Sequence, residues 1–122
     1  MKGKVLIIDD DPRNIFALAA TLKTKGFQCL SALTAGEGIA FMKEDKDIKV
    51  VLLDMMMPEM DGYEVLQVIR SDKELAGLMV VAVTAQAMLG DREKCLEAGA
   101  DNYVSKPIDV DRLLKIITPH AV

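Results

Sequence analysis

Several features that would indicate other classes of protein are missing from this sequence of 122 residues. The two cysteines, Cys29 and Cys95, lie far apart without a CxxC spacing, which argues against a zinc site or a disulfide framework. We expect both to be small buried hydrophobic residues. No apolar run approaches the roughly 20 residues of a membrane helix, and the first residues are too few for a signal peptide. We therefore expect a cytoplasmic protein with no membrane partner.

An excess of positive charge is missing as well. The chain has 15 Lys and Arg residues against 19 Asp and Glu residues, a formal net charge of −4. Because nucleic-acid surfaces are ordinarily basic, no nucleic-acid partner is expected. No low-complexity run interrupts the sequence, whose composition is 51% hydrophobic and 28% charged. This length and composition predict one domain over residues 1–122 with its own core.

A rhythm of short apolar segments followed by helical patterns is present five times. The apolar segments are mostly β-branched or aliphatic, as buried strands are, and comprise residues 5–8, 27–31, 50–53, 79–83 and 101–105. The first helical pattern places Ile15, Leu18, Ala19 and Leu22 at i, i+3, i+4 and i+7. Such a stripe is buried on one side, which predicts helices packed against a sheet.

Residues at the ends of these helices support the same division. Asp11 before Pro12 predicts an N-cap with proline at the first helical position, and Thr34 with Glu37 has the spacing of a capping box. Gly26 and Gly99 stand where a left-handed residue commonly ends a helix. The last helix, which carries Val110, Leu113, Leu114 and Ile117 on one stripe, is expected to end near Ile117, so we expect no effector domain after it.

Alternating strands and helices predict a parallel sheet covered on both faces, joined by right-handed crossovers. The fold class is then α/β, a doubly wound (βα)5 sandwich. In such sheets ligands bind outside the carboxyl ends of the strands. Chemistry is therefore expected among the residues that follow the predicted strands.

Those residues form a short and unusual set, namely Asp9, Asp10, Asp54, Thr84 and Lys106. Taken singly, Thr84 could be a loop hydroxyl bonded to local backbone and Lys106 a solvated lysine. Three neighbouring carboxylates, however, repel one another by about 1–4 kcal/mol per close pair. A protonated carboxyl would relieve this repulsion, and a divalent cation together with the Lys106 ammonium would do so more directly. Mg²⁺ suits a few carboxylate oxygens and retained waters.

This arrangement suits a phosphoryl group, because aspartate is a known nucleophile for making an aspartyl phosphate. Phosphoryl transfer chiefly requires positioning and neutralisation of the phosphoryl oxygens, which a metal ion and a lysine supply. Asp54 would be the acceptor.

Four motifs in this order, IIDDDP, LLDMMMPEMDG, VVAVTAQA and YVSKP, resemble the receiver domain of two-component response regulators over essentially the whole chain. The resemblance implies a flavodoxin-like, five-stranded parallel sheet of order 2-1-3-4-5. It also implies that Asp54 is the phosphoacceptor. Asp10 matches the direct ligand of Mg²⁺, for which Mn²⁺ can substitute, and Asp9 the acid that helps to hold the metal. The backbone carbonyl of Met56 matches the third protein ligand.

Further positions match the switching machinery of that family. Thr84 matches the switch hydroxyl, Lys106 the lysine that pairs with the phosphoryl group, and Tyr103 the aromatic switch, although a plain strand tyrosine is the alternative for Tyr103. The Lys106–Pro107 bond matches one that is cis in the family. Met56 and Gln86 match positions that tune the lifetime of the acyl phosphate.

The function implied is a switch, with no substrate turnover beyond its own phosphorylation and dephosphorylation. A histidine kinase or a histidine phosphotransfer protein would donate the phosphoryl group. A downstream protein would then read a surface formed by the fourth helix, fifth strand and fifth helix. The chain is either a stand-alone regulator or a receiver taken from a larger protein such as a hybrid histidine kinase. His120, in the expected tail, is not expected to carry a phosphoryl group.

Particular residues speak against two rival functions, and a third has no residue in its favour. A phosphatase of the haloacid dehalogenase type would need a second acid two residues past the acceptor, where Met56 stands. A flavodoxin-like FMN carrier would need a hydroxyl- and glycine-rich loop after the first strand, but Asp9, Asp10 and Asp11 occupy that loop and would repel a phosphate. A receiver that switches without phosphate has no residue in its favour.

Overall fold

Strands and helices alternate along the chain in the computed structural model, which describes residues 3–57, 61–85 and 90–121. In chain order the elements are β1 (Lys4–Ile8), α1 (Pro12–Thr24), β2 (Gln28–Ala32), α2 (Ala35–Glu44), β3 (Ile48–Asp54), α3 (Gly62–Ser71), β4 (Met79–Thr84), α4 (Asp91–Glu97), β5 (Asn102–Ser105) and α5 (Val110–Ala121). Each of the five predicted strands is confirmed to within two residues at either end.

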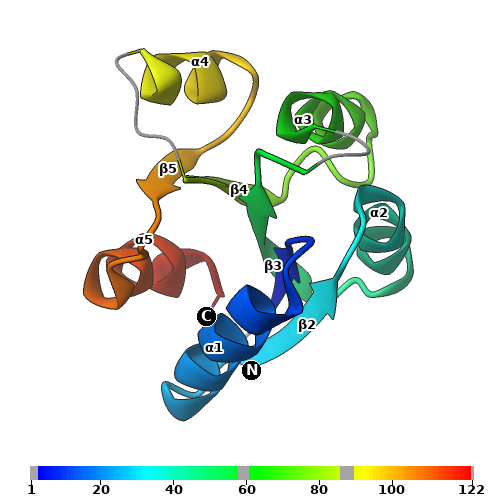
Figure 1. Ribbon diagram of the computed structural model, residues 1–122. Coiled ribbons are helices and arrows are strands. Elements are labelled where there is room, and N and C mark those ends of the chain that lie inside the picture. Colours follow the sequence, from blue (N-terminus) through cyan, green and yellow to red (C-terminus); the bar gives the residue numbers. More distant parts are fainter. Residues whose placement is uncertain (1–2, 58–60, 86–89, 122) are drawn as a thin grey trace.

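The strands form one parallel sheet in the order β2-β1-β3-β4-β5, as the resemblance implied. α1 and α5 cover one face of this sheet, and α2, α3 and α4 cover the other (Figure 1). The α/β doubly wound fold class is thereby confirmed. Because all strands run the same way, their carboxyl ends meet at one edge, where β1 and β3 lie side by side.

Side chains alternate between two cores along each strand. Val5 and Ile7 of β1 face α1 and α5, whereas Leu6 and Ile8 face the other three helices. β3 is buried on both faces except at Lys49, which is the expected character of a central parallel strand. The helices contribute the stripes that the sequence predicted, including Ile15 and Leu22 from α1.

Local capping places the helices as predicted. Asp11 accepts a hydrogen bond from the Arg13 N–H, Thr34 Oγ1 accepts one from the Glu37 N–H, and Asp61 starts α3 in the same way. The two glycines that follow α1 and α4, Gly26 and Gly99, have φ of 91° and 119°. Residues with a side chain favour negative φ, so glycine, which has none, suits both positions.

Two sequence expectations need correction. α5 does not end near Ile117 but continues to Ala121, with Pro119 inside its final turn, so that His120 is helical and exposed. Proline has no N–H to donate, which removes one backbone hydrogen bond close to the end of the helix, and the Thr118 hydroxyl donates to the Leu114 carbonyl. Cys95 is buried as expected, but Cys29 is only half-buried because β2 is an edge strand.

Candidate functional site

The carboxyl ends of β1 and β3 bring the acidic residues together. Ile8 and Leu53 are paired in the sheet, so Asp9 and Asp54 leave neighbouring strands at the same level. Both are buried, with 6% and 5% of their surface exposed, while Asp10 is exposed. One oxygen from each of these three carboxylates lies within 4.8 Å of the others.

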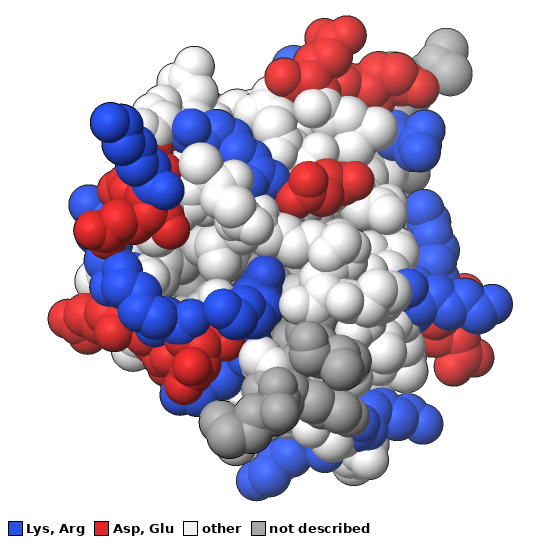
Figure 2. Space-filling view, turned by 180° about the vertical axis from the view of Figure 1, so that it is seen from behind, with Lys and Arg blue, Asp and Glu red and all other residues white. Residues whose placement is uncertain are grey.

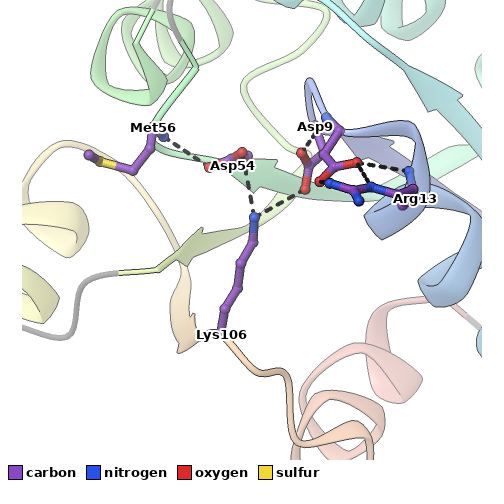
Figure 3. Close-up of polar contacts among 6 residues, drawn as sticks. Asp9, Arg13, Asp54, Met56 and Lys106 are labelled. Atoms are coloured by element: carbon purple, nitrogen blue, oxygen red, sulfur yellow. Dashed lines mark hydrogen bonds and ion pairs between the residues drawn. The ribbon is translucent and has the colours of Figure 1, made fainter.

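Lys106 reaches the same point from the end of β5. Its Nζ lies 3.3 Å from Asp9 Oδ2 and 3.7 Å from Asp54 Oδ2, between the two acids (Figure 3). The backbone N–H of Lys106 donates to the Thr84 carbonyl at 2.7 Å, which continues the β4–β5 pairing past the strand end. The Lys106–Pro107 bond is cis, as expected. The lysine is therefore attached to the sheet beside the acids it faces.

Backbone N–H groups orient both buried acids in the same way. The Asp11 N–H donates to Asp9 Oδ1 at 2.9 Å, and the Met56 N–H donates to Asp54 Oδ1 at 2.9 Å. Each acid thus has one oxygen held by the chain two residues further on, and its other oxygen, Oδ2, faces Lys106 (Figure 3). The Met56 side chain is exposed, and the proposed metal contact of its carbonyl stays a prediction.

The electrostatic balance of the site is negative. Burial raises the pKa of the Asp54 carboxyl above its ordinary value, and the charges of Asp9 and Asp10 raise it further. The hydrogen bond from the Met56 N–H and the charge of Lys106 lower the same pKa, but less than the sum of the opposing effects. The charge on Asp54 is therefore incompletely compensated by the protein itself.

The donor set fits a hard divalent cation. Three carboxylates face one ammonium group, an excess of two negative charges, and the oxygens are close enough to share one ion. Two of the acids are buried, which distinguishes the cluster from a group of solvated surface acids. Magnesium accepts such oxygens together with water, so the residues present are suited to it.

The two residues expected to switch lie on neighbouring strands. Thr84 is the last residue of β4, pairs with Ser105 in the sheet, and is buried, with 4% of its surface exposed. Tyr103 pairs with Ala82 and is also buried, on the face covered by α2, α3 and α4. Burial raises the pKa of the Tyr103 phenol. The switching roles of Thr84 and Tyr103 stay predictions.

One feature beside the site was missed by the sequence reasoning, a cavity of about 280 Å³ between α1 and the loop from β5 to α5. Asn14 and Leu18 of α1 and Ile108 of the loop line it, together with Asp9, Asp54 and Lys106. No sequence pattern marks such a space, since it depends on how two helices pack. Gln86, the second tuning position, lies outside the described residues.

The fold and the site together define a receiver domain, and similarity to known proteins agrees. Residues 5–118 match the family described as response regulator receiver domain, and the chain belongs to it. The chain is 34% identical over 115 residues to protein PilH of Pseudomonas aeruginosa, covering 94% of each. It is 37% identical over 119 residues to sensor histidine kinase RcsC of Salmonella typhi, covering 96% of this chain but only 12% of that protein.

A solved structure extends the similarity to three dimensions. The receiver domain of sensor histidine kinase PA1611 from Pseudomonas aeruginosa superposes with a TM-score of 0.87 at 26% identity, covering 99% of this chain and 98% of that one. That domain was crystallised with a magnesium ion coordinated in its active-site cleft. The flavodoxin-like arrangement expected from the sequence is thus shared with this receiver.

The rest of the surface gives few further indications. Figure 2 shows basic and acidic side chains interspersed over the face turned away in Figure 1, without a continuous basic field. Within the described residues, none of the helices has both the length and the apolar character that crossing a bilayer requires.

Proposed function

We propose that this protein is a phosphorylation-dependent signalling switch whose phosphoacceptor is Asp54. The observation that carries the proposal is the position of Asp54, a buried carboxylate at the end of a central strand, with Lys106 and two further acids around it. Membership of the receiver family supports the same assignment. Asp9 and Asp10 each place a carboxylate oxygen within 4.8 Å of one on Asp54, which suits them to metal binding.

In the proposed transfer, an Asp54 carboxylate oxygen attacks the phosphorus of a phosphohistidine on the donor. The O–P bond forms as the P–N bond breaks, and the imidazole nitrogen leaves with the electron pair. Asp54 Oδ1 is held by the Met56 N–H at 2.9 Å, so Oδ2, which faces Lys106, is the oxygen we assign as nucleophile. The Lys106 ammonium is placed to neutralise charge on the transferred group.

Asp9, Asp10, Asp54 and the Met56 carbonyl are the residues we propose to hold Mg²⁺ or Mn²⁺. When bound, the ion would neutralise the phosphoryl oxygens and the surplus carboxylate charge. The magnesium ion in the receiver of the PA1611 kinase supports this choice of metal. The protein's own contribution is to orient Asp9 through the Asp11 N–H and Asp54 through the Met56 N–H before the metal binds.

The signal follows from the added charge. A phosphoryl group on Asp54 brings nearly two negative charges, which attract the Thr84 hydroxyl and the Lys106 ammonium. Thr84 ends β4, so its movement would shift the chain that leads to α4. The Tyr103 side chain on β5 would then change its rotamer. The surface formed by α4, β5 and α5 would change shape, and a downstream protein would bind the changed surface. The Tyr103 side chain is already buried in this structure. We therefore propose that phosphorylation raises the fraction of molecules in which Tyr103 is buried.

The proposed donor is a histidine kinase or a histidine phosphotransfer protein. The receiver-sized match to RcsC, a sensor histidine kinase, supports a donor of this kind. We further propose that residues 1–122 act as a single receiver domain in the cytoplasm, without nucleic acid or membrane as partners.

Intact-protein mass spectrometry tests the proposal. The protein is incubated with acetyl phosphate or phosphoramidate, in Mg²⁺ or in EDTA, alongside Asp54→Asn. We expect one phosphoryl adduct that requires both Mg²⁺ and Asp54. An adduct of equal yield on Asp54→Asn, or an unmodified wild type in every condition including a phosphorylated histidine donor, would contradict the proposal.

A further inference from the structure

The cavity beside the acidic site is large enough for a small organic molecule. Its volume is about 280 Å³, and much of its wall is apolar, including Ala17, Leu18, Leu52, Val83, Ile108 and Val110. A cavity of about 150 Å³ lined by apolar side chains suffices to hold benzene. This one has room for a ring or a short aliphatic chain together with a polar head.

The charged residues at one end of the cavity determine whether the polar head of such a molecule should be positive or negative. Asp9, Asp54 and Lys106 are its charged lining residues, and the side chains of the two acids are only 8% and 6% exposed. The acids outnumber the lysine, and the carboxylate of Asp10 lies within 4.8 Å of both. In the metal-free protein an anionic head would be repelled here, whereas a cationic head would be attracted.

Lys106 itself illustrates the chemistry that fits. It is an ammonium group on an apolar stem, placed between Asp9 and Asp54 (Figure 3). Its distances of 3.3 and 3.7 Å are longer than those of a strong charge-assisted bond, about 2.7–2.9 Å. The lysine side chain is also 25% exposed, so its ammonium can move toward solvent. A second ammonium entering from the cavity can therefore take shorter contacts with the same oxygens.

We propose that this cavity binds a small amphipathic cation, a primary amine on an aromatic or short aliphatic body. The ammonium contacts Asp9 and Asp54, and the body lies between α1 and the loop from β5 to α5. The inference rests on the proposed function in one respect, that the same carboxylates hold the metal. Amine and Mg²⁺ then exclude each other, and the amine is an inhibitor of phosphorylation at low Mg²⁺.

The first experiment measures binding without a metal or a phosphoryl donor. 2-Phenylethylamine is titrated into the ¹⁵N-labelled protein in EDTA and followed by amide chemical shifts, with 2-phenylethanol and 3-phenylpropanoate as neutral and anionic comparisons. We expect saturable shifts around Leu18, Val83 and Val110, with the comparison compounds at least about tenfold weaker. Added Mg²⁺ should raise the apparent Kd of the amine. Equal binding of the alcohol, or no saturable shift at the cavity, would overturn the inference.

A matched pair of substitutions on α1 tests whether the apolar part of the amine lies in this cavity. Ala17 lines this cavity, whereas Ala20 lines a separate groove between α1 and β2. Ala17→Leu should weaken amine binding by at least about tenfold, as expected for a filled site, while Ala20→Leu binds like the wild type. Both variants should keep the Mg²⁺-dependent adduct with acetyl phosphate. Equal amine binding by both variants would overturn the assignment to this cavity.

The two proposals fail separately in these experiments. A protein that accepts a phosphoryl group on Asp54 but does not bind the amine retains the proposed function and loses the further inference. A protein that binds the amine in the cavity but acquires no phosphoryl adduct does the reverse.

Discussion

Charged side chains are well compensated at one end of the sheet and poorly compensated at the other. At the amino ends of β4 and β5, Arg70 donates to the carbonyls of Gly99, Ala76 and Leu78 and to Asp101 Oδ2, at 2.7–2.8 Å. Asp101 Oδ2 also accepts the Val80 N–H at 2.8 Å. At the carboxyl ends, buried acids face one lysine at 3.3 and 3.7 Å.

This difference separates stability from function. The Arg70 contacts satisfy the loops that precede two strands, so their charges contribute to the folded state. The acidic end is left with uncompensated negative charge, which suits the binding of a cation. Sites of this kind are expected to cost stability that other parts of the fold supply.

The largest effect is expected from removing Arg70. Arg70→Met removes the arginine donors from three carbonyls and leaves Asp101 with the Val80 N–H alone, and we expect the free energy of unfolding to fall by about 2–4 kcal/mol. Chemical denaturation measures the change. Arg70→Lys should lower the free energy of unfolding somewhat less than Arg70→Met does, since lysine keeps the positive charge but lacks the several N–H donors of the guanidinium group. Lys73→Met, at an exposed lysine just after α3, should be nearly neutral; a loss at Lys73 equal to that at Arg70 would contradict this reading.

The same substitution at the two ends should have opposite signs. In EDTA at pH 7, Asp54→Asn should raise the free energy of unfolding, because burial and neighbouring acids raise the Asp54 pKa. Asp101→Asn should lower it, because Asp101 accepts from Arg70 and Val80. The gain at Asp54 exists where that carboxyl is ionised in the folded chain. It should shrink as the pH falls through the raised pKa of Asp54 in the folded chain, and it should be absent below the ordinary aspartate range, where folded and unfolded chains both bind the proton. A destabilised Asp54→Asn protein would contradict the comparison.

A smaller effect is expected at Lys106. Its ion pairs are longer than those of Arg70 and partly solvated, so Lys106→Met should change the free energy of unfolding by less than about 1 kcal/mol. The rate of phosphorylation by acetyl phosphate should fall, since the ammonium no longer neutralises the transferred group. Denaturation and adduct formation are measured on the same preparation. A loss of stability comparable to that of Arg70→Met would show that Lys106 is mainly structural.

The smallest effect concerns the packing of α3 on α4. Burial and the Cys95 thiol, whose Sγ lies 3.7 Å from the Tyr63 hydroxyl, raise the pKa of Tyr63 to about 12. The Lys94 ammonium lies 5.0 Å from the centroid of the same ring. Ultraviolet titration of wild type and Tyr63→Phe should therefore assign a phenol step near pH 12 to Tyr63. A Tyr63 step near the ordinary value of 10 would contradict the packing.

Much of the fold was predictable because local signals and burial agree. The strands are short apolar segments between capped helices, and Asp11 and Thr34 cap as their spacing suggested. The end of α5 was not predictable in the same way. Proline usually indicates the end of a helix, but Pro119 lies within the last turn of α5. Cys29 was misjudged because nothing in its own segment shows that β2 is an edge strand.

The site was predictable to a similar extent. The rule that ligands bind at the carboxyl ends of parallel strands brought Asp9, Asp54 and Lys106 together, although 97 residues separate Asp9 from Lys106. The Arg70 contacts and the cavity were not predicted. They join loops and helices distant in sequence, and their geometry depends on packing that no local pattern encodes.

The central claim is that Asp54, and not one of its acidic neighbours, accepts the phosphoryl group. The most direct measurement is borohydride reduction of the phosphorylated protein, which converts an aspartyl phosphate to homoserine, followed by peptide sequencing in a mass spectrometer. We expect homoserine at position 54 and unchanged aspartate at positions 9 and 10. Homoserine at position 9 or 10, with aspartate intact at position 54, would contradict it.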